Sequence, residues 1–309
     1  MTGQIPMWQK GLFLMKNKKL ATVFAVLAAA LYAINIPLSK LLLTQVGSTM
    51  MAAFLYLGAG LGMLLTCTIG DLTKTRKKKD RLTKKELPYT VAMVVLDILA
   101  PILLMIGITK TNAANVSLLN NFEIVATSLI ALLIFKEVIT RKLWFAIGLV
   151  TIASILLSFS GLGAFTFNSG SLFVLGASIC WGFENNCTRM LSTKSSEQIV
   201  IIKGCFSGLG SLIIALIIGE SIPSFGLILA ILLLGFVAYG LSINFYIMAQ
   251  KDLGAAKTSA YYSIAPFLGV AFSMLLLHER PALQFYFALF IMILSTVLMT
   301  KDTPEQNHP

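Results

Sequence analysis

The chain has 309 residues, of which 57% are hydrophobic and only 12% are charged, whereas soluble domains average about 25% charged residues. A mean hydropathy of +0.85, with apolar runs along nearly the whole chain, indicates a polytopic α-helical membrane protein. The runs are continuous and do not alternate, which excludes a transmembrane β-barrel. Although the net charge is +11, the basic residues cluster in short loops between the apolar runs, so a nucleic-acid partner is not expected.

Ten spans of roughly the length that a bilayer requires are predicted along the chain. The first follows Lys16, Lys18 and Lys19; it is longer than the apolar region of a signal peptide and contains Pro37, so it is expected to be retained. The predicted spans are 20–43, 47–70, 88–109, 112–135, 142–161, 169–191, 198–219, 225–249, 255–278 and 281–300.

The distribution of Lys and Arg predicts that both termini lie on the cytoplasmic side of the cell membrane. Of the 24 basic residues, Lys110 and Arg280 are the two in loops on the other side, and Lys40 and Lys203 lie within spans. Lys203 is about two turns into its helix and is expected to extend its amine to the cytoplasmic surface, with an ion pair to Glu184 as the alternative. The basic loop 74–85 is expected to contact anionic lipid headgroups.

The fourth span carries a polar stripe whose spacing suits one face of a helix. The stripe consists of Ser117, Asn120, Glu123 and Thr127. The stretch 111–137 has a counterpart 142 residues later, at 253–279, and the sixth span matches the first with a shift of 149. Because each copy has an odd number of spans, the second copy enters the membrane upside down, as in many secondary transporters. The predicted divisions are a tail at 1–19, copies at 20–161 and 169–300, a linker at 162–168 and a tail at 301–309.

At these segments the chain resembles the EamA-type members of the drug/metabolite transporter superfamily. The resemblance rests on TNAANVSLL in the fourth span, LGAAKTSAYYSIAP in the ninth, WGFENNCTRML in the sixth and the acidic ends FKE and LHE. It implies alternating access through a central cavity lined by the first four helices of each copy, with the fifth and tenth helices peripheral. It does not imply a particular substrate.

Three acids, Asp97, Glu123 and Glu184, lie well inside spans. A charge at the bilayer centre costs about 2.5–3.5 kcal/mol, so three of them facing lipid would cost about as much as the whole stability of a typical protein. We therefore expect these acids to face a hydrated cavity, to be paired or to be protonated. In the repeat, Asp97 matches Tyr239, Glu123 matches Ala265 and Glu184 matches Asn35. This asymmetry suggests a site shaped for one ligand.

Polar and aromatic neighbours on the same helix faces complete the predicted site. The residues expected to bind substrate or couple protons are Asp97, Glu123, Glu184, Asn35, Asn120, Asn185, Tyr239, Tyr262, Tyr32 and Trp181. The residues expected to act in gating are Pro266, Glu137 and Glu279. Each has a structural alternative: the asparagines could join helices, the aromatic rings could only pack, and the two terminal glutamates could pair with Lys136 and Arg280.

The acids, with no base recognised at mid-membrane, suggest a secondary transporter for a cationic or zwitterionic solute such as an amino acid or amine. Proton exchange is assigned to Glu123 or Glu184. The alternatives are a channel, a non-transporting membrane scaffold and an intramembrane enzyme. A homodimer is left open as a further partner. The enzyme is disfavoured because the chain contains no HExxH or GxSxG motif, and His278 and His308 lie at a helix end and in the tail. Neither a cofactor nor a metal is expected, because the four cysteines have no metal-ligand spacing.

Overall fold

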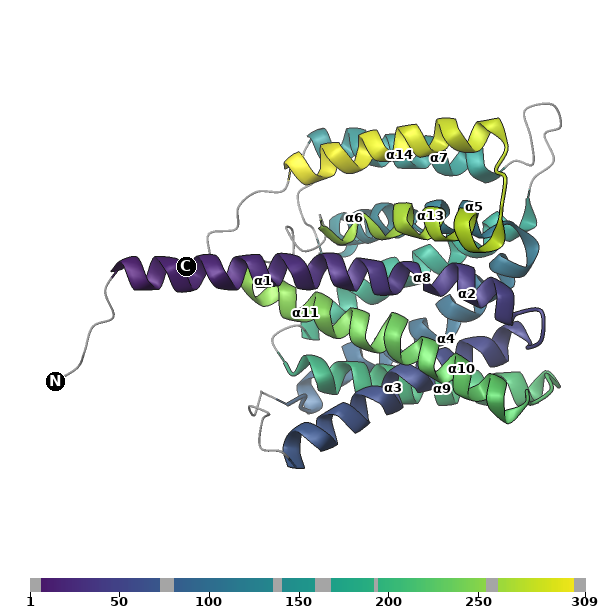
Figure 1. Ribbon diagram of the computed structural model, residues 1–309, viewed down its shortest axis with the longest axis horizontal. Coiled ribbons are helices and arrows are strands. Elements are labelled where there is room, and N and C mark those ends of the chain that lie inside the picture. Colours follow the sequence, from purple (N-terminus) through teal and green to yellow (C-terminus); the bar gives the residue numbers. More distant parts are fainter. Residues whose placement is uncertain are drawn as a thin grey trace.

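A computed structural model describes residues 7–72, 81–135, 141–158, 168–191, 194–253 and 261–302, and every regular element in these ranges is helical (Figure 1). The first half contains α1 (Met7–Ala33), α2 (Asn35–Leu42), α3 (Ser48–Leu72), η1 (Lys84–Glu86), α4 (Leu87–Lys110), α5 (Ala113–Leu119), α6 (Phe122–Phe135) and α7 (Arg141–Ser158). The second half contains α8 (Ser169–Leu191), α9 (Ser196–Ile217), α10 (Phe225–Gly235), η2 (Phe236–Leu241), α11 (Ser242–Leu253), α13 (Ala265–Leu277) and α14 (Leu283–Asp302).

These helices make the chain a multi-pass membrane protein. Within the described ranges, six helical segments are long and apolar enough to cross a bilayer, and three shorter apolar helices accompany them. Within the described residues each predicted span is mainly helical. Helix α1 begins at Met7 and not near residue 20, because the Lys, Met and Leu residues that precede the apolar run favour helix as well. The start of the predicted ninth span lies outside the described residues.

The two halves pack around an approximate two-fold axis. Helix α4 packs along α8, and α1 packs along α11, which is the same contact with the two halves exchanged. Two pairs of equivalent helices meet each other directly, α3 with α9 and α7 with α14, and the equivalent fourth and ninth spans meet through α5 and α13. Figure 1 shows α7 and α14 side by side at one edge of the bundle, where the fifth and tenth spans were expected to be peripheral.

Two spans are interrupted at equivalent positions. The fourth span breaks at Asn120 and Asn121, between α5 and α6, and the ninth has a turn at Ser263 and Ile264 just before α13. A shift of 142 residues carries Asn121 onto Ser263. Broken helices at corresponding places in two inverted halves typically lie beside the substrate site in transporters, because they leave backbone polar groups free at mid-membrane.

The break divides the polar stripe that the sequence predicts on one helix face. Ser117 lies against Gly269 of α13, and Asn120 is hydrogen-bonded to Tyr32 of α1. Beyond the break, Glu123 and Thr127 face Asn185 of α8. The stripe therefore contacts three helices and does not form one continuous polar face.

Helices α3 and α9 approach so closely that only glycine fits at their crossing. A Cβ placed on Gly204 would overlap the backbone of Gly60 and the carbonyl of Tyr56. Such small residues allow close packing between helices in a membrane, where no hydrophobic effect drives them together. Gly60 of α3 and Gly204 of α9 therefore have a structural role.

We expect Gly204→Ala to lower the stability of the folded protein by about 1–3 kcal/mol, because the overlapping atoms are backbone and cannot rotate away. Thermal unfolding of the purified protein in detergent would measure the change. Gly148→Ala is the control, since a Cβ on this exposed residue of α7 meets nothing within 4 Å. Equal melting temperatures for the two variants would contradict this reading of the crossing.

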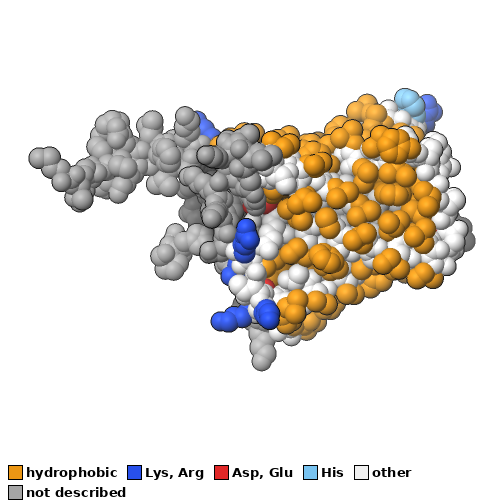
Figure 2. Space-filling view, turned by 90° about the horizontal axis from the view of Figure 1, so that it is seen from below, with side chains coloured by type: hydrophobic (Ala, Val, Ile, Leu, Met, Phe, Trp, Pro, Cys, Tyr) orange, Lys and Arg blue, Asp and Glu red, His pale blue; other side chains and the backbone are white. Residues whose placement is uncertain are grey.

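The molecular surface has a broad apolar band with Lys and Arg side chains gathered mainly at one end, as Figure 2 shows. We call this end the basic end; its described residues are Lys19, Arg81, Lys84, Lys85, Arg141, Lys142, Arg189 and Lys194. The opposite end carries the α2–α3, α4–α5, α9–α10 and α13–α14 connections. Large apolar side chains within the band, such as Leu133 and Phe290, are more than two-thirds exposed, as expected of a surface that faces lipid.

Candidate functional site

Two of the predicted acids meet at a lysine inside the helix bundle. The Nζ atom of Lys203 lies 3.0 Å from Asp97 Oδ2 and 3.0 Å from Glu184 Oε1. The side chains of the three residues are 9%, 0% and 2% exposed, so this cluster, which we call the ionic triad, is buried. With all three groups charged, the triad carries a net charge of −1.

The triad corrects the main expectation for Lys203, whose amine does not extend to the surface. The alternative, an ion pair with Glu184, is the one observed, and Asp97 joins it as a second partner. The prediction failed because it considered the reach of the side chain and overlooked how many acids lay at the same depth. Lys203 is about two turns from the basic end of α9, and Glu184 is about two turns from the basic end of α8. A buried lysine between two carboxylates costs less free energy than either acid left unpaired.

Two aromatic residues connect the triad to the middle of the bundle. The hydroxyl of Tyr56 donates to Asp97 Oδ1 at 2.9 Å, and the indole Nε1 of Trp181 donates to Tyr56 at 3.4 Å. The Tyr56 ring lies 5.2 Å from that of Tyr239, measured between centroids. Tyr56 was not recognised from the sequence; the available signal was a tyrosine two turns inside an apolar span.

Glu123 lies apart from the triad. Its Oε1 atom accepts a hydrogen bond of 2.6 Å from Asn185 Nδ2, which also lies 3.3 Å from the hydroxyl of Thr127. No lysine or arginine forms an ion pair with Glu123 within the described part of the chain. Glu123 and Asn185 are both half-buried, whereas the acids of the triad are sealed from solvent.

Aromatic rings surround the middle of the bundle beside Glu123. Tyr32 lies 5.8 Å from Tyr239 and 5.9 Å from Tyr262, and Tyr262 lies 5.0 Å from Tyr246, all between ring centroids. These rings come from α1, the η2–α11 segment and the helical turn before α13, so both halves contribute. Tyr32, Tyr246 and Tyr262 are half-buried and keep some accessible surface.

A neutral hydrogen bond stands where the two-fold axis would place a second copy of the triad. Asn35 Nδ2 donates to the hydroxyl of Tyr239 at 3.1 Å, and Ser39 donates to Asn35 Oδ1. Asn35 is the repeat equivalent of Glu184, and Tyr239 is the equivalent of Asp97. The contact between these two helices is thus neutral in one half and ionic in the other. The asymmetry predicted for single residues is therefore an asymmetry between two equivalent helix contacts.

Side chains close the opposite end by binding the ends of helices. The carboxylate of Glu279 accepts from the backbone N–H groups of Ala113 at 2.8 Å and Ala114 at 2.9 Å, at the start of α5. Lys40 donates to the carbonyls of Ile108 and Thr111, where α4 ends. Glu279 follows α13 of the second half, so its carboxylate joins the two halves above the site through charge-assisted hydrogen bonds.

Of the other predicted gating residues, Pro266 lies in the first turn of α13, directly after the turn at Ser263 and Ile264. Proline is favoured there because the first turn of a helix needs no N–H donor, and it prevents the helix from continuing straight through the turn. Glu137 lies outside the described residues.

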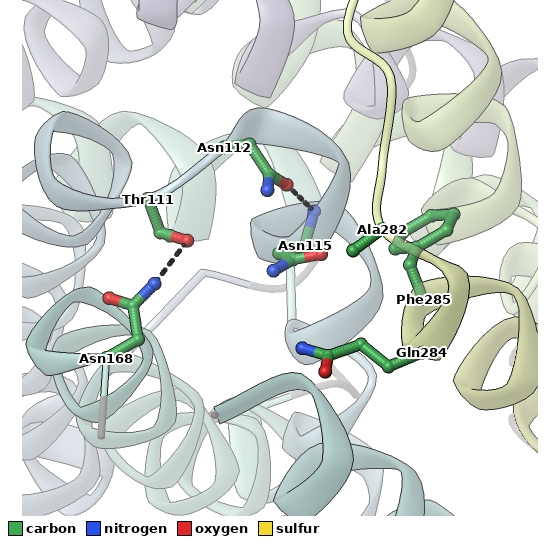
Figure 3. A pocket seen from close by; sticks show the side chains of 7 residues that line it. All are labelled: Thr111, Asn112, Asn115, Asn168, Ala282, Gln284 and Phe285. Carbon is green, nitrogen blue, oxygen red and sulfur yellow. Dashed lines mark hydrogen bonds between the residues drawn. The ribbon is translucent and has the colours of Figure 1, made fainter. Parts of the chain in front are cut away.

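A cavity of about 240 Å³ lies at the opposite end, away from the acids. Neutral side chains line it, and Figure 3 shows those of Asn115, Asn168 and Gln284 around it. Asn168 donates to Thr111 at 2.9 Å, and Asn112 accepts from the backbone of Asn115. The acid-lined pocket that the sequence predicts is therefore not this cavity; the acids lie deeper, among packed helices.

These features are those of a membrane transporter: inverted halves, helices broken at mid-depth, and ionisable side chains buried between the halves. Residues 19–159 and 168–301 match the EamA-like transporter family, and the chain belongs to this family.

Two further comparisons agree with this family. A protein described as an uncharacterized transporter, from Methanothermobacter thermautotrophicus, is 23% identical over 269 residues, which are 82% of this chain and 78% of that protein. A solved crystal structure with 14% identity superposes with a TM-score of 0.66 and covers 93% of this chain and 98% of its own, so it has the same fold.

Proposed function

We propose that this protein is a secondary carrier that moves a small cationic or zwitterionic organic solute, such as an amino acid or an amine, by alternating access. The observation that carries the proposal is Glu123, a half-buried carboxylate at mid-bundle with no ion-pair partner among the described residues. An unpaired charge at this depth is costly, and a cationic solute would remove that cost when it binds.

The surroundings of Glu123 support a cation over an anion. Together with the ionic triad, Glu123 brings the charge of these four side chains to −2, because they comprise three acids and one lysine. The rings of Tyr32 and Tyr262 lie beside the acid and present the π-faces that attract ammonium groups. The asparagines would orient the solute through hydrogen bonds.

The two ends of the molecule suggest how access would alternate. We place the basic end in the cytoplasm of the cell and both termini with it, because Lys and Arg concentrate on the cytoplasmic side of membrane proteins. Glu279 and Lys40 then close the outward path in this conformation. Opening would separate α13 from α5, with the turn before Pro266 as the hinge. Basic residues of the loop 74–85 would contact anionic lipid headgroups.

Glu123 is also our candidate for proton coupling. A carboxylate that binds either a proton or a cationic solute, but not both, couples the movements of the two in opposite directions. The acids of the triad are less suited to this exchange, because Lys203 holds both in an ionic contact that solvent does not reach.

We expect Glu123→Gln to abolish solute movement while leaving the folded protein in the membrane, because glutamine keeps the shape and loses the charge. A thermal-shift screen of the purified wild type with amino acids and amines would first select the solute, since a ligand of the folded state raises its melting temperature. Counterflow of that solute in proteoliposomes would then compare the variants; a channel would show none.

Glu86→Gln is the matched control, because Glu86 is half-buried like Glu123 but lies at the basic end, in a capping box with Thr83 that glutamine can also complete. Counterflow at the wild-type rate in the Glu123 variant would refute the assignment of this acid.

A further inference from the structure

One acceptor in the site has no donor. Asn120, at the break between α5 and α6, is 5% exposed, and its Nδ2 atom donates to the hydroxyl of Tyr32 at 3.0 Å. Its carbonyl oxygen Oδ1 is buried and has no hydrogen-bond partner. Buried polar atoms in folded proteins nearly always have a partner, so an unpaired oxygen within a candidate binding site points to a donor that the ligand brings.

A second acceptor lies one turn further along the chain. Across the break, the backbone N–H of Glu123 donates to the carbonyl of Asn120 at 3.1 Å, and in such a tight turn the side chains of residues three apart lie on the same side. The Glu123 carboxylate accepts one hydrogen bond, from Asn185, and an ionised carboxylate has room for about four. Glu123 also lies within electrostatic reach of Tyr32 and Tyr262. The pair thus offers acceptor positions beside aromatic rings.

We infer that the solute binds through an ammonium group that carries N–H bonds, and that Asn120 selects such a group over a quaternary ammonium. This inference rests on the cation-binding role proposed for Glu123. A primary ammonium has three donors: one can reach Asn120 Oδ1, another can reach the carboxylate, and the charge faces the rings. A trimethylammonium has the same charge but no donor, and it would leave Oδ1 unpaired.

The free-energy cost of leaving Asn120 Oδ1 unpaired determines how much more tightly a primary amine should bind than its fully N-methylated counterpart. Failure to satisfy one buried neutral acceptor corresponds to roughly 5- to 150-fold in affinity. A site that depended on charge and rings alone would bind both ammonium types to within a few fold, and aromatic cages readily accept the quaternary type. Because the amine can also donate to Glu123, it is the change of this ratio when Asn120 is replaced, and not the ratio alone, that reports on Asn120.

The test uses matched pairs of ligands on the purified full-length protein. The probes are ethanolamine, phenethylamine and putrescine, each beside its fully N-methylated counterpart, with thermal shift and counterflow in proteoliposomes as readouts. We expect the wild type to prefer the amine of at least one pair by 5-fold or more. In Asn120→Leu, and in the smaller change Asn120→Ser, the preference should fall to less than about 3-fold.

Asn121→Leu is the control for the helix break itself. Asn121 is the neighbouring asparagine of the same turn, but its amide points to Met292 of α14 and away from the tyrosines. This variant should keep the wild-type preference. If Asn121→Leu lost the preference as fully as Asn120→Leu, the break and not the Asn120 oxygen would be responsible, and the inference would be wrong.

The two proposals fail in different ways. Equal binding of amines and their methylated counterparts, with both dependent on Glu123, would overturn the role of Asn120 and leave the cation carrier standing. If none of the cations bound or moved, the cationic substrate class would fail, and the inference with it.

Discussion

Replacing Lys203 by methionine should destabilise the folded protein by about 3–5 kcal/mol, because it leaves Asp97 and Glu184 as two unpaired acids in a buried place. Methionine keeps most of the length and volume of the side chain, so the loss would come from charge and not from a cavity. Unfolding in detergent, followed by heat or denaturant, would measure it. This is the largest stability effect that we expect from any single substitution here.

Removing the two acids together with the lysine should restore most of the stability, because no unpaired charge is then left in the bundle. Combining Lys203→Met with Asp97→Asn and Glu184→Gln removes all three charges, and we expect this triple variant to recover most of the lost stability. Lys194→Met is the surface control: Lys194 lies 3.6 Å from Glu86 in a solvent-accessible ion pair, which contributes no more than about 1 kcal/mol. A Lys203 variant as stable as the Lys194 variant would show that the buried acids do not need the lysine.

Replacing Glu279 by alanine should open the end that its carboxylate closes. The two hydrogen bonds to the start of α5 are charge-assisted, a class worth about 1.5–3 kcal/mol each. Losing even the lower value should raise the open fraction about tenfold. The measurement is the rate at which a membrane-impermeant maleimide reacts with Ser117→Cys, a residue of α5 that is fully buried in the closed arrangement. The native cysteines would be replaced in every background.

Glu220→Ala separates opening from the loss of a helix cap. Glu220 binds the N–H groups of Thr49 and Met50 at the start of α3, at the same end and through the same chemistry as Glu279. Helix α3 is held independently by its close crossing with α9, so we expect no faster labelling in this variant. Equal acceleration in both variants would mean that loosening any helix end admits the reagent, and that Glu279 is not a gate.

The positions of the spans and their duplication were accessible from the sequence because they depend on local properties. Hydropathy over about 20 residues located the helices, since every backbone polar group in a bilayer must be satisfied within its own segment. The matches of 111–137 with 253–279, and of the sixth span with the first, predicted the two-fold relation that the packing of α1, α4, α8 and α11 displays.

The partners of the polar residues were not accessible in this way. Asp97 and Glu184 were recognised as costly, but the sequence offered Lys203 a route to the surface and gave no reason to prefer the triad. The sequence did not predict the break at Asn120, because an asparagine within an apolar run is equally compatible with the polar face of an unbroken helix. It became visible only where the backbone turns between α5 and α6.

The sequence by itself determined that this chain is a helical membrane protein with inverted halves and buried acids, because hydropathy, charge distribution and repeats are summed along the chain. Only the tertiary structure decided that Lys203 pairs with two of those acids and that Glu123 lies beside the tyrosines with no ion pair among the described residues. The physical reason is that an ion pair depends on distances of a few ångströms between helices, and packing sets those distances, not spacing along the chain.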